Sequence, residues 1–132
     1  MRSPNEIPAK GQIMQQRKLG ASGPMVSVIG LGAMSFGGIF GPTDEAESFA
    51  CLDALLETGI TFIDTANIYG MGVSETVIGK WLASRKPQVV LATKASFVAD
   101  PERRIDNSET HLRAELEKSL KRLGRDHVEL FY

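Results

Sequence analysis

The sequence predicts an α/β fold built on a parallel β-sheet. Short apolar segments alternate with amphipathic segments of helical periodicity, in the order strand–helix–strand–helix–strand–helix–strand. Each amphipathic segment is long enough to form one crossover helix, and two successive parallel strands require such a crossover. The regular alternation therefore indicates a sheet whose strands are joined by right-handed strand–helix–strand connections.

The first 42 residues predict a leader, a hairpin, a strand and a loop. Residues 1–13 are polar, contain two prolines and lack the apolar core of a secretory signal, so we expect a flexible leader. Residues 13–28 predict a β-hairpin, because residues 20–24 (GASGP) are rich in turn formers. Residues 28–32 predict a short strand, and residues 33–42 predict a glycine-rich loop.

A first helix is predicted over residues 43–58. Asp44 is a candidate N-cap with Glu47 three residues later, as in a capping box, and Gly59 provides a stop. Its apolar residues recur at helical spacing: Phe49, Leu52, Leu55 and Leu56. The apolar residues 60–64 that follow predict a strand ending at Asp64.

Two further helices and two further strands complete the predicted order. The second helix begins near Ser74, although Gly79 within it costs about 1 kcal/mol relative to alanine. It should bury Val77, Ile78, Trp81 and Leu82. A strand over residues 89–93 and a polar loop over residues 96–107 follow. The third helix extends from a Ser108 cap to Gly124 at C′. Its apolar stripe is Leu112, Leu116, Leu120 and Leu123. Residues 127–132 predict the last strand.

Two architectures fit this order of elements: a doubly wound open sheet and a (β/α)8 barrel of which the chain holds about half. A whole barrel takes about 250 residues, and four strands in 132 residues are close to half of that. The sequence ends within the apolar segment Leu130–Tyr132, where an exposed strand would leave backbone groups unpaired. We therefore expect a barrel truncated to about four strands and three helices, preceded by the hairpin.

Composition excludes several classes of function. The 15 basic and 16 acidic residues nearly balance, so no nucleic-acid partner is expected. No apolar stretch approaches the roughly 20 residues that span a membrane. One cysteine and two histidines have no metal-ligand spacing, so no metal is expected. A single cysteine also allows no intrachain disulfide, and these observations together lead us to expect a soluble cytoplasmic protein.

Three polar residues follow the predicted strands at positions that suggest catalysis. Asp64 ends one strand, Tyr69 lies five residues later, and Lys94 follows the next strand. In a barrel, the carboxyl ends of the strands and the loops after them carry reactive groups. Tyr69 could protonate a carbonyl oxygen, and a nearby Lys94 ammonium would lower the phenol pKa from about 10. Asp64 would keep Lys94 charged and hold it in place.

A competing motif lies in the glycine-rich segment. Residues 30–35 (GLGAMS) resemble the dinucleotide-binding fingerprint, but the sixth position is serine, and no acidic residue ends a strand about 20 residues later. We interpret these glycines as allowing a tight turn and a close approach of a ligand to the backbone.

The chain also resembles the N-terminal half of the aldo-keto reductase family. The matching segments are 17–20 (RKLG), 22–23 (SG), 26–27 (VS), 30–32 (GLG), 62–66 (FIDTA), 69–70 (YG), 74–75 (SE) with Gly79, 91–94 (LATK) and 116–124 (LEKSLKRLG). They occur in the family's order and spacing over residues 14–132, so we assign this range as the N-terminal half of such a barrel.

The resemblance implies a (β/α)8 barrel that uses NADPH, or NADH in some members, to reduce small aldehydes and ketones to alcohols. It implies that Tyr69 is the general acid, supported by Asp64 and Lys94. It also places Gly32, Ala33, Met34 and Asp64 at the nicotinamide end of the cofactor, and the hairpin at the bottom of the barrel.

The family pattern extends beyond this sequence. Its fourth catalytic residue, a histidine usually two positions after Tyr132, is absent, as is the second half of the barrel with most of the cofactor site. We therefore expect an incomplete N-terminal fragment that is inactive alone and, if truly truncated, self-associates through open sheet edges. The alternative is a non-catalytic, cofactor-binding regulatory subunit of the same fold.

Overall fold

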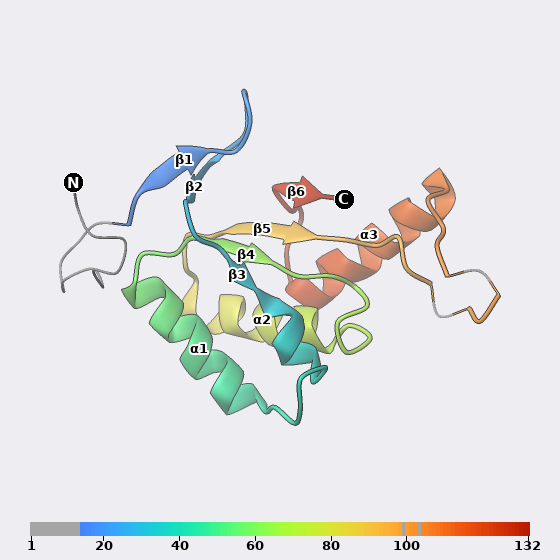
Figure 1. The fold of residues 1–132 in the computed structure, drawn as a ribbon, viewed down its shortest axis with the longest axis horizontal. Coiled ribbons are helices and arrows are strands. Elements are labelled where there is room, and N and C mark those ends of the chain that lie inside the picture. Colours follow the sequence, from blue (N-terminus) through green and yellow to red (C-terminus); the bar gives the residue numbers. More distant parts are fainter. Residues whose placement is uncertain (1–13, 99, 103) are drawn as a thin grey trace.

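The computed structural model describes residues 14–98, 100–102 and 104–132, so the leader predicted over residues 1–13 lies outside the described residues. The elements follow the predicted order (Figure 1). A two-stranded hairpin comes first, and a four-stranded parallel sheet with three crossover helices forms the rest.

The parallel sheet has its strands in sequence order. It consists of β3 (Leu31–Gly32), β4 (Phe62–Asp64), β5 (Val90–Thr93) and β6 (Leu130–Phe131), each paired in parallel with the next. The register places Gly32 beside Asp64 and Asp64 beside Ala92. In the wall of a barrel, strands that are consecutive in sequence are parallel neighbours, as they are here. In a doubly wound sheet the strand order reverses at a switch point, and the described strands show no such reversal.

The predicted hairpin is present. Strands β1 (Gln16–Lys18) and β2 (Met25–Ser27) pair antiparallel, with Arg17 opposite Val26. Ser27 connects the hairpin to the parallel sheet, because its backbone NH donates to Thr61 Oγ1 at 3.1 Å and its hydroxyl accepts from the Thr61 NH at 2.9 Å. The hairpin lies on the side of the sheet away from the helices (Figure 1).

The three crossover helices begin close to the predicted residues. Helix α1 is Glu45–Glu57, α2 is Val73–Arg85 and α3 is Glu109–Leu123. The predicted caps are confirmed: the Asp44 carboxylate accepts from the Glu47 NH at 2.8 Å, and Ser108 Oγ accepts from the His111 NH at 3.3 Å. Such caps satisfy backbone donors that have no partner within the helix. Figure 1 shows all three helices on one side of the sheet.

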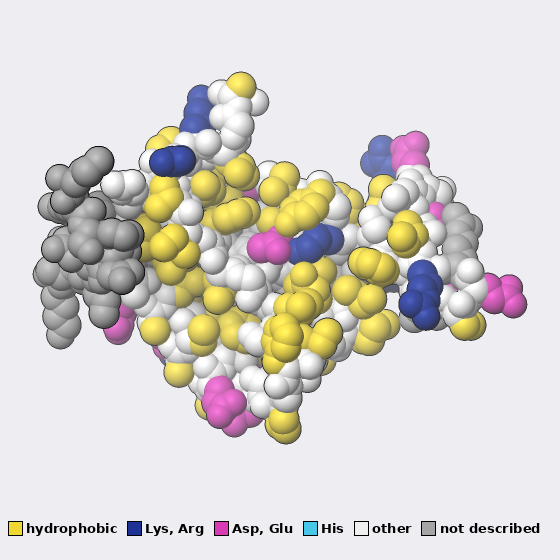
Figure 2. Space-filling view, viewed as in Figure 1, with side chains coloured by type: hydrophobic (Ala, Val, Ile, Leu, Met, Phe, Trp, Pro, Cys, Tyr) yellow, Lys and Arg dark blue, Asp and Glu magenta, His cyan; other side chains and the backbone are white. Residues whose placement is uncertain are grey.

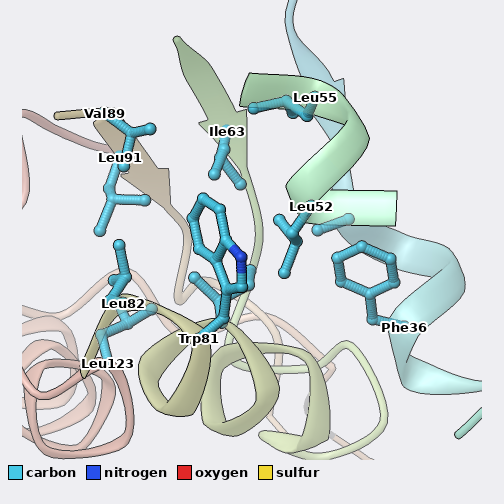
Figure 3. Packing of buried hydrophobic residues seen from close by; sticks show 11 residues of the cluster. Phe36, Leu52, Leu55, Ile63, Trp81, Leu82, Val89, Leu91 and Leu123 are labelled. Carbon is cyan, nitrogen blue, oxygen red and sulfur yellow. The ribbon is translucent and has the colours of Figure 1, made fainter. Parts of the chain in front are cut away.

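The hydrophobic core lies between the sheet and these helices (Figure 3). Trp81 of α2 is fully buried, and its indole lies between Ile63 of β4, Leu91 of β5 and Leu52 of α1. Its Nε1 donates to Asp53 Oδ1 at 2.8 Å, so the one polar atom of the ring has a partner at the edge of the core. Val77, Ile78 and Leu82 are also buried, as predicted.

Helices α2 and α3 are in unusually close contact at Gly79. A Cβ atom at this position would lie 2.1 Å from the Arg122 carbonyl oxygen, which is far inside contact distance. Only glycine therefore allows the two helix backbones to approach this closely. The glycine that weakened the sequence-based prediction of α2 is thus required by the packing of the helix.

A buried ion pair lies beside this contact. Glu75 of α2 is fully buried, and its two carboxylate oxygens accept from Arg122 Nε and Thr93 Oγ1, both at 2.6 Å. The three residues come from α2, α3 and β5, so this pair fixes both helices against the sheet. A buried charge is tolerated only when it is paired and hydrogen-bonded in this way.

Three details differ from the sequence-based predictions. The segment predicted as a loop contains a 3-10 helix, η1 (Ala33–Gly37). Leu56 of α1 is 36% exposed, whereas Leu52 and Leu55 are buried in the core and Phe49 packs against it. On α3 only Leu123 of the predicted stripe is fully buried, whereas Leu112, Leu116 and Leu120 are half-buried. The fully buried residues of α3 are Ser119 and Leu123, so the leucine stripe is only partly covered.

The face of the sheet opposite the helices is open. A cavity of about 530 Å³ lies between the hairpin and the sheet, and Phe62, Asp64 and Tyr132 are among the residues that line it. Figure 2 shows hydrophobic side chains spread over the centre of the molecule, with an acidic and a basic side chain among them. Among the described residues, β3 and β6 each have a neighbouring strand on one side only.

Candidate active site

The structure places Asp64, Tyr69 and Lys94 at the carboxyl end of the parallel sheet. Asp64 is the last residue of β4, Lys94 directly follows β5, and Tyr69 lies in the connection from β4 to α2. Asp64 pairs with Ala92 in the parallel register. Because side chains alternate between faces along a strand, Lys94, two residues after Ala92, projects on the same side of the sheet as Asp64.

Asp64 and Lys94 form an ion pair. Lys94 Nζ lies 2.7 Å from Asp64 Oδ2 and also donates to the Thr65 carbonyl oxygen at 2.8 Å. The side chains are 26% and 28% exposed, so water screens this pair only in part. Two acceptors on one ammonium group restrict where the lysine charge can lie.

Tyr69 contributes an aromatic ring beside this ammonium group. Lys94 Nζ lies 5.1 Å from the centre of the Tyr69 ring, within the range of a cation–π interaction. The backbone around Tyr69 is held by a turn, with its NH donating to the Ala66 carbonyl at 3.2 Å and its own carbonyl accepting from the Ser74 NH at 3.2 Å. The three predicted residues are therefore brought together around the Lys94 amine.

The 3-10 helix η1 contacts the turn that carries Tyr69. A Cβ atom on Gly37 would lie 2.4 Å from the Gly70 nitrogen and 2.5 Å from the Tyr69 carbonyl carbon. Gly70 itself has φ +62°, a conformation that side chains disfavour. Glycine at both positions allows the two backbones to touch, and this contact holds the Tyr69 backbone against η1.

A fourth residue, Tyr132, joins this group, and the sequence analysis did not identify it. Its hydroxyl donates to Asp64 Oδ1 at 2.6 Å, and Lys94 Nζ lies 5.2 Å from the centre of its ring. The Tyr132 backbone NH donates to the Thr93 carbonyl at 3.1 Å, which continues the pairing of β6 with β5. Alternation along the strand could have placed this side chain on the Asp64 side of the sheet, because Tyr132 lies two residues after Leu130, the partner of Ala92.

The titration of two groups reflects this geometry. Burial alone would lower the pKa of the Lys94 amine, but the hydrogen bond and charge of Asp64, with a contribution from Tyr69, raise that pKa above its usual value. The hydrogen bond to Asp64, followed by burial and the Asp64 charge, raises the pKa of the Tyr132 phenol, while the Lys94 charge acts in the opposite direction. Lys94 is therefore a cation, and Tyr132 a neutral donor, at neutral pH.

The residues expected at the nicotinamide end of a cofactor lie beside this group. Gly32 is exposed at the end of β3, opposite Asp64, and no atom lies within 4 Å of a Cβ atom built on it. Ala33 is fully buried, and its carbonyl accepts from Ser74 Oγ at 2.8 Å. Met34 is half-buried. Gly32 thus leaves open space beside Asp64, whereas Ala33 is held within the fold.

A hydroxyl pair links this segment to the lysine site. Ser74 Oγ lies 3.0 Å from Thr65 Oγ1, and both side chains are fully buried. Ser74 also holds the Ala33 carbonyl, and the Thr65 carbonyl accepts from Lys94. The start of η1, the end of β4 and the start of α2 are therefore joined by consecutive hydrogen bonds.

The described ranges, 14–98, 100–102 and 104–132, contain no cluster of three His, Cys, Asp or Glu residues that could hold a metal ion. Within the same ranges, none of the helices has the length and apolar character that crossing a membrane requires.

The chain matches a known protein family over most of its length. The model of the Aldo/keto reductase family matches residues 28–132. This chain belongs to the aldo/keto reductase family. The resemblance stated from the sequence motifs is thus confirmed.

Individual relatives agree with this membership. The uncharacterized oxidoreductase YrpG of Bacillus subtilis is 43% identical and is aligned with 89% of this chain and 39% of its own length. The aldo-keto reductase yakc [NADP(+)] of Schizosaccharomyces pombe is 35% identical, over 88% of this chain and 35% of its own. The holo form of aldo-keto reductase AKR11C1 from Bacillus halodurans superposes with a TM-score of 0.76 at 34% identity, covering 89% of this chain and 39% of that one.

The chain therefore spans about 35–39% of the length of these aldo-keto reductase relatives. Its parallel sheet, three crossover helices and hairpin form the corresponding part of a (β/α)8 barrel, as predicted. The residue roles predicted for the site remain predictions.

Proposed function

We propose that the complete product of this gene is an NAD(P)H-dependent oxidoreductase that reduces small aldehydes and ketones to alcohols. The observation that carries the proposal is the Asp64–Lys94 ion pair, with its 2.7 Å contact, placed under the ring of Tyr69. In this proposal, Tyr69 gives its proton to the carbonyl oxygen of the substrate. The Lys94 charge stabilises the phenolate that Tyr69 then becomes, and Asp64 keeps that charge in position.

The residues beside Asp64 fit a nicotinamide cofactor. A flat ring needs open space next to the reacting carbonyl, and Gly32 leaves such space at the end of β3. In this proposal Gly32, Met34 and Asp64 hold the nicotinamide end, whereas Ala33, which was also predicted there, is fully buried and supports the segment from within the fold. When bound, the reduced cofactor would supply the hydride that reaches the carbonyl carbon. We favour NADPH because the related yakc protein is named for NADP(+), with NADH as the alternative.

The activity is proposed for the complete gene product. This chain spans about 39% of the YrpG relative, and we propose that residues 14–132 alone do not complete the reaction. The cavity beside Asp64 is open to solvent. An open site leaves water around the reacting carbonyl, and water weakens each electrostatic contribution.

The first prediction concerns Tyr69→Phe, which removes the proposed proton donor and keeps the ring. Loss of a general acid should lower kcat for aldehyde reduction by roughly 10²–10⁴-fold. The measurement is NADPH oxidation, followed by absorbance, with simple aldehydes and the complete gene product. Glu109→Gln, which removes an exposed charge on α3, is the control and should leave kcat unchanged.

Two results would contradict this assignment in different ways. Normal turnover by Tyr69→Phe would exclude Tyr69 as the acid. Tight NADPH binding in calorimetry by the unmodified protein, with negligible turnover of every carbonyl compound tested, would instead favour the non-catalytic regulatory subunit.

A further inference from the structure

Asp64 is shared between two donors that approach from different strands. Its Oδ2 accepts from Lys94 at 2.7 Å, and its Oδ1 accepts from the Tyr132 hydroxyl at 2.6 Å. A carboxylate that is bonded through only one oxygen can still rotate about its last torsion. With both oxygens bonded, that rotation is blocked, and the Lys94 contact has a fixed direction.

The Lys94 ammonium also lies within cation–π distance of two aromatic rings. Its distances to the ring centres of Tyr69 and Tyr132 are nearly equal, 5.1 and 5.2 Å. Both rings can attract the cation through their faces. Each ring therefore attracts the same ammonium group, and the second tyrosine adds an attraction that keeps the charge in the position from which it acts on Tyr69.

We propose that Tyr132 is a positioning residue of this site: its hydroxyl locks the Asp64 carboxylate, and its ring confines the Lys94 ammonium beside Tyr69. The proposal rests on the function proposed above and adds a residue to it. Tyr132 acts through Asp64 and Lys94, and no contact of Tyr132 with a substrate is required.

The strand pairing supports this role. The Tyr132 NH is bonded to the Thr93 carbonyl of β5, one residue before Lys94. The backbones that carry the phenol and the amine are therefore fixed relative to one another. The Tyr132 residue is 54% exposed, so water can reach it, yet its hydroxyl bonds to Asp64.

The first experiment tests the hydrogen bond itself by NMR. The complete gene product is labelled with [ζ-13C]tyrosine, and the Tyr132 resonance is assigned by its loss in Tyr132→Phe. The charged groups facing this phenol are Asp64 and Lys94, with Tyr69 across the amine and with Arg17 and Lys18 of the hairpin along the same cavity. In Asp64→Asn, the Tyr132 midpoint should move to lower pH, because the acceptor charge that favours the protonated phenol is gone.

A second variant covers the case in which Asp64→Asn does not fold. In Lys94→Met the Tyr132 midpoint should move to higher pH, because the ammonium charge opposes the effect of Asp64. Far-ultraviolet circular dichroism checks the fold of each variant. A Tyr132 resonance that titrates at the same pH in the unmodified protein and in the folded variants would overturn the proposal.

The second experiment tests the positioning role by kinetics. Tyr132→Phe removes the hydroxyl and keeps the ring, and it should lower kcat by up to about tenfold with little change in the KM for the aldehyde, since a hydrogen bond to a charged group is lost. Tyr132→Leu also removes the ring and should lower kcat further. An unchanged kcat in both variants would overturn the positioning role, even if NMR showed the hydrogen bond.

The two proposals fail in distinguishable ways. Retention of activity by Tyr69→Phe would remove the proposed acid, whereas the NMR titration would still decide whether Tyr132 holds Asp64. Conversely, loss of activity in Tyr69→Phe with no effect of any Tyr132 substitution would leave the proposed function intact and remove Tyr132 from it.

Discussion

At the scale of single residues, the site depends on how one carboxylate distributes its two oxygens. Asp64 receives a cation on one oxygen and a neutral phenol on the other. The ion pair with Lys94 has the larger electrostatic energy. The hydrogen bond from Tyr132 fixes the orientation of the Asp64 carboxylate. A substitution that removes the lysine charge, such as Lys94→Met, should therefore differ in the pH dependence of its effects from one that removes only the orienting hydrogen bond, such as Tyr132→Phe.

The Lys94 pair predicts a loss of stability at high pH. Because the folded state raises the Lys94 pKa, the pair contributes fully below the ordinary value of 10.5, and the contribution is lost as pH rises through the folded pKa. The difference in unfolding free energy between the unmodified protein and Lys94→Met should thus be constant at neutral pH and shrink above pH 10.5. Urea unfolding of the two proteins over this pH range measures it, and a difference that grows with pH would contradict the pairing.

The buried acid of α2 gives a second prediction at residue scale. Glu75→Gln keeps the shape of the buried side chain but removes the charge that accepts from Arg122, which is itself 25% exposed, so it should destabilise the fold by about 1.5–3 kcal/mol. The control is Glu109→Gln, which breaks an exposed ion pair with Arg113 on α3 and should change stability by less than about 1 kcal/mol. Denaturant unfolding compares them, and equal effects of the two substitutions would argue against a buried charge pair.

At the scale of elements, the α2–α3 contact predicts a strong preference for glycine. Gly79→Ala would place a methyl group 2.1 Å from the Arg122 carbonyl oxygen, and helix separation should cost about 1–3 kcal/mol despite the better helix propensity of alanine. Gly32→Ala is the matched control, because no atom lies within 4 Å of the added carbon. Thermal unfolding should show a lower midpoint for Gly79→Ala only. A higher midpoint for Gly79→Ala would mean that the helix propensity of alanine outweighs the steric contact with Arg122.

The sequence predicted these elements where local signals and burial agree. The caps at Asp44 and Ser108 are short-range interactions, and both were predicted correctly. The 3-10 helix η1 was missed because its glycines also suit a loop, and what orders it is the distant backbone of Tyr69 and Gly70. The burial of Glu75 and its ion pair were not predicted for the same reason, since its partners lie on α3 and β5.

The candidate site was predictable to the extent that strand order is predictable. Parallel neighbours bring their carboxyl ends together, so the meeting of Asp64 and Lys94 followed from the order of elements alone. The contact of Tyr132 with Asp64 spans three strands, from β6 across β5 to β4, and required the exact register. No sequence motif indicates this register, although the alternation of side chains along the strand could have placed Tyr132 on the same side of the sheet as Asp64.

At the scale of the whole molecule, the sheet leaves one face and two edges open among the described residues. Parallel sheets are normally covered on both faces, and unpaired edges promote association. A polypeptide comprising residues 1–132, prepared by itself, should therefore self-associate through β3 and β6. Sedimentation velocity at several concentrations measures this, and a compact monomer with cooperative thermal unfolding would contradict it.

The single tryptophan of the chain, Trp81, lies at the centre of the core with its nitrogen bonded to Asp53. Arg85 binds the same carboxylate, so α1 and α2 meet around one indole group. Tryptophan fluorescence of this chain therefore reports on the core between the helices and the sheet. An emission change on adding a ligand at the opposite face of the sheet would mean that the strands transmit the binding event to the helical layer.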